Sequence, residues 1–204
     1  MKIQAVLFDF GGVLAEEGFY DGLVKLAQQQ GLDQHTIADD GANAVYDSGF
    51  VLGKGSAKDF WALMRERTGL SGDDDYLTNV ILDGFVVRDW MITGVKKLQT
   101  EGYITGILSD QTHWLDELDQ KYHFTSAFDH LYNSYYLGKG KRDSSLFVDV
   151  ASDLQLPPAA ILFIDDNAGN VERAQAQGWG VIHYINREDF SARFSRLLDI
   201  KSGS

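Results

Sequence analysis

The sequence contains no cysteine, and this absence removes several classes of site. Disulfide bonds, thiolate nucleophiles and metal sites built on thiolates are all excluded. The histidines do not compensate, because they lack the short spacing of zinc ligands. They are His35, His113, His123, His130 and His183. A zinc site is therefore not expected.

Positive charge is also scarce. Lysine and arginine together number 18 against 30 aspartates and glutamates, which leaves a formal net charge of −12. An acidic surface repels nucleic-acid backbones and anionic lipids, so we expect neither nucleic-acid nor membrane binding. A small anionic substrate would then need a locally positive pocket.

Long hydrophobic runs are missing as well. The longest run, 159–164, is far shorter than the ~18 residues that a membrane span requires. The first residues lack the apolar stretch of a signal peptide, so a cytoplasmic protein is expected. A chain of 204 residues suits one large domain, or one core that carries an inserted module.

Four short apolar segments, 3–8, 103–109, 159–164 and 180–184, are typical of buried strands. Strands that are apolar throughout suit a parallel sheet that is covered on both faces. Between them, helical spacing predicts helices over 91–102, 144–156 and 167–178. The pattern predicts an α/β fold with an open, mainly parallel, Rossmann-like sheet and helices on both faces.

The segment 15–90 interrupts this alternation. It contains four stretches of helical spacing and no candidate strand. These stretches are 20–31, 35–48, 56–69 and 73–85. We therefore predict an α/β core domain, made of 1–14 and 91–204, and an all-helical domain of 15–90 inserted after the first strand.

Acidic and hydroxyl side chains follow three of the predicted strands, where each strand ends. Asp9 follows the first strand, Ser109 the second, and Asp165 with Asp166 the third. Ligands of open α/β sheets bind outside the carboxyl ends of the strands, so these side chains are expected at one edge. Adjacent carboxylates repel each other unless a cation lies between them. Asp9, Asp165 and Asp166 are thus predicted to form a Mg²⁺ site.

A phosphate group suits the same edge. Gly11 and Gly12 let backbone N–H groups approach an anion, and the hydroxyl of Ser109 is placed to donate to a phosphate oxygen. The segment GKGKR, 138–142, lies between the second and third strand ends and is the expected source of a fixed cation.

The order of these features resembles the haloacid dehalogenase-like hydrolase superfamily over essentially the whole chain. The four matching segments are FDFGGVL, ILSD, YYLGKGKRDSSLF and ILFIDDNAGNVERAQAQG. The first is an Asp-x-Gly-Gly-Val-Leu variant of the family's first motif. The resemblance implies a phosphatase-type member, whose helical insertion is a small cap that closes over the site and selects the substrate.

The resemblance also implies roles for individual residues. Asp9 would attack phosphorus and form an aspartyl-phosphate, with Lys141 as the second catalytic residue. The phosphate-binding residues would be Ser109, Asp110, Gly11, Gly12 and Lys141. The Mg²⁺ ligands would be Asp9, the carbonyl of Gly11, Asp166 and Asp165. Asn170 would contact these ligands and not the metal itself, at a position where members of the family often carry an acidic residue.

Three positions depart from the family pattern: Gly11, Asp110 and Arg142, which replaces the proline commonly found after the lysine. Gly11 stands where the family's phosphatases usually carry a second Asp, which protonates the leaving oxygen and later activates water. Such acid–base help is typically worth ~10²–10⁴-fold in rate. Asp110 replaces the usual Asn, and its charge opposes anion binding unless it points away or pairs with Lys139 or Arg142.

The expected function is that of a Mg²⁺-dependent phosphatase acting on a small phosphorylated metabolite, such as a sugar phosphate. Two alternatives stay open. One is a binding or regulatory member of the fold with impaired catalysis, suggested by Gly11 and Asp110. The other is a metal-free 2-haloacid dehalogenase. A monomer or a homodimer is expected, and the substrate depends on cap residues that the sequence does not identify.

Overall fold

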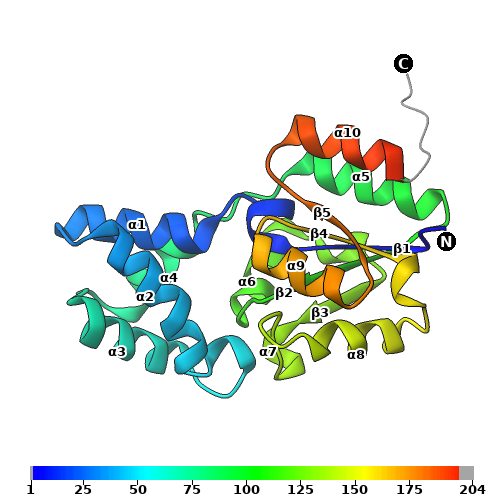
Figure 1. Ribbon diagram of the computed structural model, residues 1–204. Coiled ribbons are helices and arrows are strands. Elements are labelled where there is room, and N and C mark those ends of the chain that lie inside the picture. Colours follow the sequence, from blue (N-terminus) through cyan, green and yellow to red (C-terminus); the bar gives the residue numbers. More distant parts are fainter. Residues whose placement is uncertain (1, 198–204) are drawn as a thin grey trace.

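The computed structural model describes residues 2–197 and shows an α/β core beside a group of helices (Figure 1). The last seven residues of the predicted core domain, 198–204, and residue 1 lie outside the described part. Among the residues described, every helix is too short or too polar to cross a bilayer.

The core is built on a five-stranded sheet in which all strands run parallel, in the order β3-β2-β1-β4-β5. The strands are β1 (Ala5–Phe8), β2 (Ile104–Ser109), β3 (His130–Asn133), β4 (Ile161–Asp165) and β5 (Gly180–His183). The expected α/β class and parallel sheet are confirmed. Strand β3 was not predicted, because this short edge strand is partly exposed and carries no apolar run.

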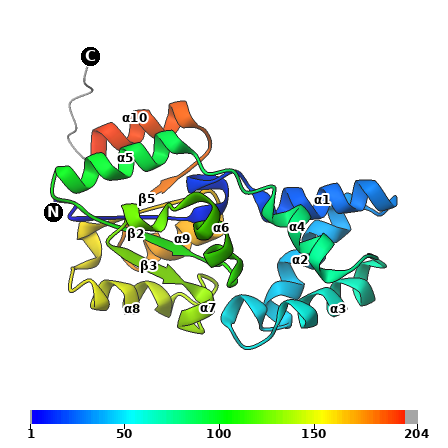
Figure 2. The same ribbon diagram turned by 180° about the vertical axis from the view of Figure 1, so that it is seen from behind.

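Helices cover both faces of the sheet (Figures 1 and 2). Val6 and Phe8 point to one face, where they join a core shared with α5 (Asp89–Thr100), α6 (Trp114–Tyr122) and α10 (Arg187–Leu197). Ala5 and Leu7 point to the other face and pack with α8 (Ser145–Asp153) and α9 (Ala168–Ala176). This alternation follows from the two-residue period of a strand.

A group of four helices, which we call the cap, lies beside the carboxyl ends of the strands. Its helices are α1 (Gly18–Gln30), α2 (Gln34–Asp47), α3 (Ala57–Thr68) and α4 (Asp74–Leu82). Each agrees with a predicted helix to within three residues at either end. A separate cap domain of 15–90 stays a prediction, although all four helices fall inside that range.

Local capping explains where the cap helices begin and end. Ser56 and Asp59 form a capping box at the start of α3, in which each side chain accepts a hydrogen bond from the other residue's backbone N–H. Asp33 and Asp73 cap α2 and α4 in a similar way. At the other end, α3 stops at Gly69, whose φ of 73° is left-handed.

The chain enters and leaves the cap at one place. Ala15 and Val87 form an isolated antiparallel bridge, and the N–H of Arg88 donates to the carbonyl of Leu14 at 2.8 Å. Arg88 also forms an ion pair with Glu16 at 2.7 Å. These contacts hold the two connecting segments against each other.

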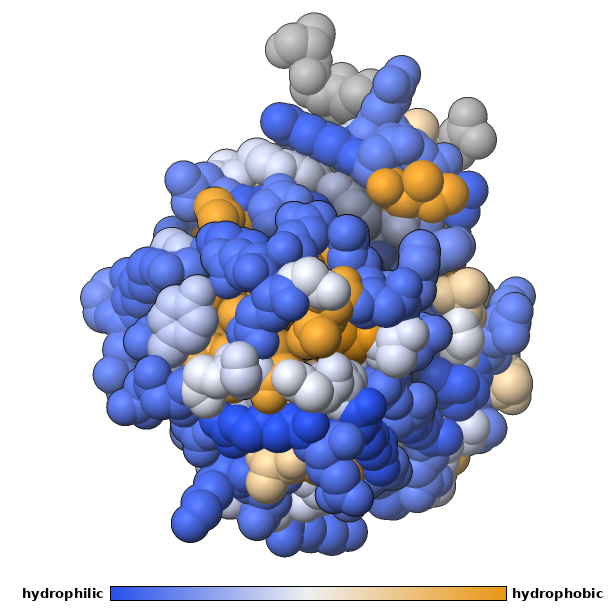
Figure 3. Space-filling model, turned by 90° about the vertical axis from the view of Figure 1, so that its left-hand side faces the viewer, coloured by the Kyte–Doolittle hydropathy of each residue, from blue (hydrophilic) through white to orange (hydrophobic). Residues whose placement is uncertain are grey.

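Aromatic packing joins the cap to the core. The ring of Phe10, in the turn after β1, stacks on Phe124 with centroids 4.8 Å apart and lies 5.6 Å from Phe85. Phe50, from the η2 turn (Phe50–Leu52), meets Trp114 edge-on at 5.2 Å. The outer surface of the cap is mainly polar around a small apolar area (Figure 3). Among the large aromatics of the cap, Phe50, Phe60 and Trp61 are buried, whereas Tyr20 and Tyr76 are exposed.

Candidate active site

The turn after β1 presents Asp9 to the carboxyl edge of the sheet. Residues Phe10–Leu14 form a π-type turn, and the N–H of Phe10 donates to Oδ1 of Asp9 at 2.7 Å. The hydroxyl of Ser109, at the end of β2, donates to the same oxygen at 2.5 Å. Two donors thus fix the orientation of the Asp9 carboxylate, which is only 8% exposed.

Gly12 brings this turn close to the acidic pair after β4. Its φ is 74°, a conformation that L residues with a side chain rarely adopt. An added Cβ would lie 2.1 Å from Oδ2 of Asp166, well inside van der Waals contact. The second glycine of the motif is therefore needed both for its backbone and for space.

Lys141 lies between two carboxylates. Its Nζ atom is 2.8 Å from Oδ2 of Asp9 and 2.7 Å from Oδ2 of Asp165. The lysine is buried, with 2% exposure. Burial alone would lower the pKa of Lys141, but the charge of Asp165 and Asp9 outweighs burial and raises that pKa. The fold thus brings together Lys141, Asp9 and Asp165, which lie far apart in the sequence.

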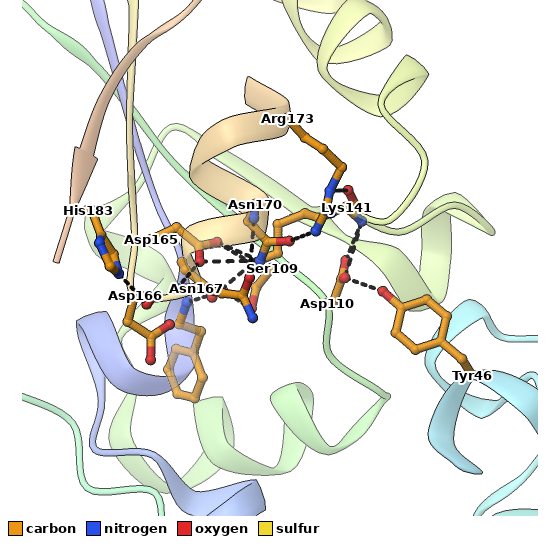
Figure 4. Close-up of polar contacts among 12 residues, drawn as sticks. Tyr46, Ser109, Asp110, Lys141, Asp165, Asp166, Asn167, Asn170, Arg173 and His183 are labelled. Atoms are coloured by element: carbon orange, nitrogen blue, oxygen red, sulfur yellow. Dashed lines mark hydrogen bonds and ion pairs between the residues drawn. The ribbon is translucent and has the colours of Figure 1, made fainter. Parts of the chain in front are cut away.

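Asp165 is held by the start of α9 (Figure 4). Its Oδ1 accepts from the N–H of Asn167 at 2.7 Å, and the amide of Asn170 donates to Oδ2 at 3.1 Å. Arg173 then donates to Oδ1 of Asn170 at 2.6 Å and to the carbonyl of Lys141 at 2.7 Å. Asn170 therefore supports Asp165, and through Arg173 it is linked to the lysine loop.

Three carboxylates gather here around one ammonium group. Asp9, Asp165 and Asp166 each offer an oxygen, and these oxygens lie within 4.8 Å of one another. Burial raises the pKa of Asp9 well above its usual range despite the opposing charge of Lys141, and burial together with Asp165 raises the pKa of Asp166. Such an excess of acids over bases fits a divalent cation that prefers oxygen ligands.

Asp110 reaches the same cavity, but its carboxylate turns toward the lysine loop and the cap. It accepts from the N–H of Lys141 at 2.8 Å and from the hydroxyl of Tyr46 on α2 (Figure 4). The expectation was that Asp110 either points away from the anion or pairs with Lys139 or Arg142, and neither of these two cations is its hydrogen-bond partner among the residues described. Lys139 instead forms an ion pair with Asp149. Phosphate binding by Asp110 stays a prediction.

Arg142 is directed to the cap. Its guanidinium lies 3.9 Å from the ring centroid of Tyr46, and it donates to the carbonyl of Ala42 at 2.8 Å. Burial raises the pKa of the Tyr46 hydroxyl, and the nearby Asp110 charge adds to the rise. The loop that carries Lys141 is thus attached directly to α2.

A cavity of about 260 Å³ opens above these residues, between core and cap. Asp9, Ser109 and Lys141 form its core side, and Phe19, Val45 and Tyr46 are among the cap residues that line it. Glu17, at the start of α1, also lines the cavity. Burial raises the pKa of Glu17 to about 7, although the N–H of Tyr20 opposes this shift.

The sequence profile of the haloacid dehalogenase-like hydrolases matches residues 3–178. The chain belongs to this family of hydrolases. The match covers the turn after β1, both carboxylates after β4 and the lysine between them.

Solved structures share the fold of this haloacid dehalogenase-like hydrolase. A HAD family enzyme of Bacteroides thetaiotaomicron superposes with a TM-score of 0.75 at 22% identity, covering 95% of this chain and 99% of its own. The same enzyme is known in complex with magnesium and inorganic phosphate, with a TM-score of 0.72, 23% identity and coverages of 94% and 99%. The L-2-haloacid dehalogenase of Xanthobacter autotrophicus has a TM-score of 0.64 and 20% identity, with coverages of 95% and 83%.

Glu17, Tyr46 and Arg173 are among the residues of this hydrolase's site that sequence reasoning missed. Glu17 and Tyr46 reach the cavity from the cap, and Arg173 reaches it from α9. Arg173 lies one turn after Asn170, so helical spacing alone could have placed it beside the site. For Glu17 and Tyr46 the sequence carries no such signal, because their position depends on how the cap folds back over the core.

Proposed function

We propose that the protein is a Mg²⁺-dependent phosphatase that hydrolyses a small phosphorylated metabolite through an aspartyl-phosphate on Asp9. One observation carries the proposal: the buried Lys141 ammonium contacts both Asp9 and Asp165 beside Asp166, at the floor of a cavity. A cation and a divalent-metal site on either side of one carboxylate suit phosphoryl transfer. The magnesium and phosphate bound by the Bacteroides enzyme support the same chemistry.

The residues present fit the metal. Mg²⁺ would be held by Asp9, Asp166 and the carbonyl of Gly11, with Asp165 beside them, and the remaining ligands would come from water and substrate. When bound, it would supply positive charge to the phosphoryl oxygens. The 4.8 Å spread of the carboxylate oxygens suits one small cation.

In this proposal each residue has a separate task. Asp9 attacks phosphorus, and the hydrogen bond from the N–H of Phe10 to its Oδ1 holds it in place for that attack. Lys141 neutralises charge on the transferred phosphoryl group. Ser109 donates to a phosphate oxygen once substrate replaces its present contact with Asp9. Asn170 acts only by holding Asp165.

The cavity sets a limit on substrate size. A volume of about 260 Å³ is slightly below the ~300–1,000 Å³ that ligand pockets typically measure. Its cap side mixes the apolar surface of Phe19 and Val45 with the tyrosine hydroxyls of Tyr20 and Tyr46. We infer a compact substrate with both polar and apolar groups. The cytoplasmic location and the monomeric or homodimeric state stay predictions.

The test is phosphate release from a panel of phosphate esters and acyl phosphates, with Mg²⁺ and with a chelator. Wild type should release phosphate only with the metal. Asp9→Asn should lower kcat by on the order of 10³-fold or more, because an amide is a poor nucleophile. Asp149→Asn is the matched control, since Asp149 is exposed, pairs with Lys139 and lies outside the cavity.

The alternatives give different results in the same assay. Calorimetric Mg²⁺ binding without phosphate release from any substrate would favour a binding or regulatory protein. Halide release from 2-haloacids in the presence of the chelator would favour a dehalogenase. Equal turnover by wild type and Asp9→Asn would exclude Asp9 as the nucleophile.

A further inference from the structure

A carboxyl group from the cap fills the space beside Gly11. A Cβ added to Gly11 would lie 3.0 Å from Oε2 of Glu17, nearer than Phe85 at 3.3 Å or Gln111 at 3.7 Å. The φ of Gly11 is −64°, so its backbone does not demand a glycine. An acid carried by another element thus stands where a side chain two residues after Asp9 would project.

The two oxygens of Glu17 are used differently. Oε1 accepts from the N–H groups of Phe19 at 3.1 Å and Tyr20 at 3.2 Å, and so caps α1. Oε2 is the oxygen that approaches Gly11. Glutamate is not among the residues preferred at an N-cap, where a shorter Asp, Ser or Asn would serve the helix. The longer side chain brings its second oxygen beside Gly11, and both residues line the cavity that Asp9 and Lys141 also line.

The neighbouring Glu16 is engaged elsewhere. Both of its oxygens bind Arg88, on the exposed side of the connection between core and cap. Of the two adjacent glutamates, Glu17 is the one that lines the cavity. Capping alone would explain Oε1, but it does not explain why Oε2 is directed beside Gly11.

We infer that Glu17 is the proton-transfer residue of this enzyme, in place of the acid that position 11 lacks. The inference rests on the proposed phosphatase function. Asp9 forms a bond to phosphorus while the bond from phosphorus to the leaving oxygen breaks, and Glu17 gives its proton to that oxygen to release an alcohol. The Glu17 carboxylate then takes a proton from the water that attacks the aspartyl-phosphate. This second step frees the Asp9 carboxylate and inorganic phosphate, and leaves Glu17 protonated again.

The test uses Glu17→Gln and phosphate compounds whose leaving groups differ in acidity. The amide keeps an oxygen that can cap α1 but has no acidic proton to give. We expect kcat/KM to fall by about 10²-fold or more for alkyl phosphates, whose leaving alkoxides need the proton. For acetyl phosphate and p-nitrophenyl phosphate, whose leaving groups need no proton, kcat/KM should fall by less than about threefold.

A second readout isolates the later step. With p-nitrophenyl phosphate and Mg²⁺, Glu17→Gln should release about one nitrophenolate per active site in a rapid burst before a slower steady rate, because its aspartyl-phosphate lacks the base for hydrolysis. Asp75→Asn is the control. It removes an exposed carboxylate from the first turn of another cap helix, α4, and should behave as wild type in both assays.

A rescue completes the design. Glu17→Ala opens the space beside Gly11, so Glu17→Ala/Gly11→Asp should recover alkyl phosphate turnover that Glu17→Ala loses. Gly11→Asp alone should gain nothing, because Oε2 of Glu17 already occupies that space.

The outcomes separate the two claims. If wild type with Mg²⁺ releases no phosphate from any compound, the proposed function fails. If wild type is active but Glu17→Gln leaves turnover intact, or lowers kcat/KM equally for every leaving group, the phosphatase stands and the role of Glu17 is overturned.

Discussion

At the residue scale, Gly12 connects the turn after β1 to the acidic pair after β4. Its left-handed φ and its closeness to Asp166 are separate constraints, and a substitution tests them together. Gly31 offers a comparison, since its φ of 69° is similar but an added Cβ would meet nothing within 4 Å. The two glycines therefore separate backbone strain from loss of space.

Gly12→Ala and Gly31→Ala should each lower the free energy of unfolding by about 1–2 kcal/mol, the usual cost of a left-handed alanine. Only Gly12→Ala should also weaken Mg²⁺ binding, by about tenfold or more, because the carboxylate of Asp166 must rotate away from the new methyl group. Urea unfolding and calorimetric titration with Mg²⁺ measure the two effects. Unchanged Mg²⁺ affinity in Gly12→Ala would show that Asp166 is not a ligand.

Some residues of the site could be predicted from the sequence, and others could not, for a physical reason. Asp9 follows β1, and Ser109 and Asp165 are the last residues of β2 and β4. Parallel strands end at one edge, so chain order alone brings these side chains together. Glu17 has the same chemistry as Glu16 beside it, and only the fold distinguishes them. The partners of Asp110 were also unpredictable, because Tyr46 belongs to a helix 64 residues away.

At the scale of single elements, a side-chain hydrogen bond at the N-terminus stabilises the first turn of some helices and is missing from others. Ser56 caps α3 through its hydroxyl, whereas Ser144 stands at the N-cap of α8 without a side-chain hydrogen bond to the helix. The two serines are therefore a matched pair.

Ser56→Ala should lower the free energy of unfolding by about 1 kcal/mol, because it leaves the N–H of Asp59 without its acceptor. Ser144→Ala should change it by no more than a few tenths of a kcal/mol, since no capping bond is lost. Urea unfolding followed by circular dichroism compares them. Equal losses in both variants would contradict a capping role for Ser56.

Of the five strands, only β3 was not predicted from the sequence, because its hydrophobic pattern is weak. β1, β2 and β4 are buried nearly throughout, and their apolar runs predicted them. In β3, His130 is partly buried and Leu131 is exposed, so its sequence carries neither a continuous run nor a clear alternation. The other edge strand, β5, was predicted although it is also only partly buried, because its sequence keeps a short apolar run.

At the scale of the whole molecule, the hydrogen bond from Tyr46 to Asp110 joins the cap to the loop of Lys141. A comparable pair, Tyr136 and Asp116, lies exposed on the core surface. The two pairs share their chemistry and differ in burial. A comparison of their coupling energies therefore measures what the cap contact contributes.

A double-mutant cycle with Tyr46→Phe and Asp110→Asn should give a coupling energy of about 1–3 kcal/mol in urea unfolding, as expected for a partly buried bond to a charged group. The same cycle with Tyr136→Phe and Asp116→Asn should give less than about 1 kcal/mol, because water competes for both groups. Similar values for the two cycles would mean that the cap does not strengthen the contact.

The bridge between Ala15 and Val87 bears on how the inserted segment of such a chain can change during evolution. Because the outgoing and returning segments touch at these residues, the register of the sheet is independent of how many residues lie between them. Insertions of other lengths and shapes can be exchanged at this junction while the strands stay paired. Substrate specificity can thus diverge within the insertion, provided that Glu17, which lies just inside it, is kept for the proton transfer proposed above.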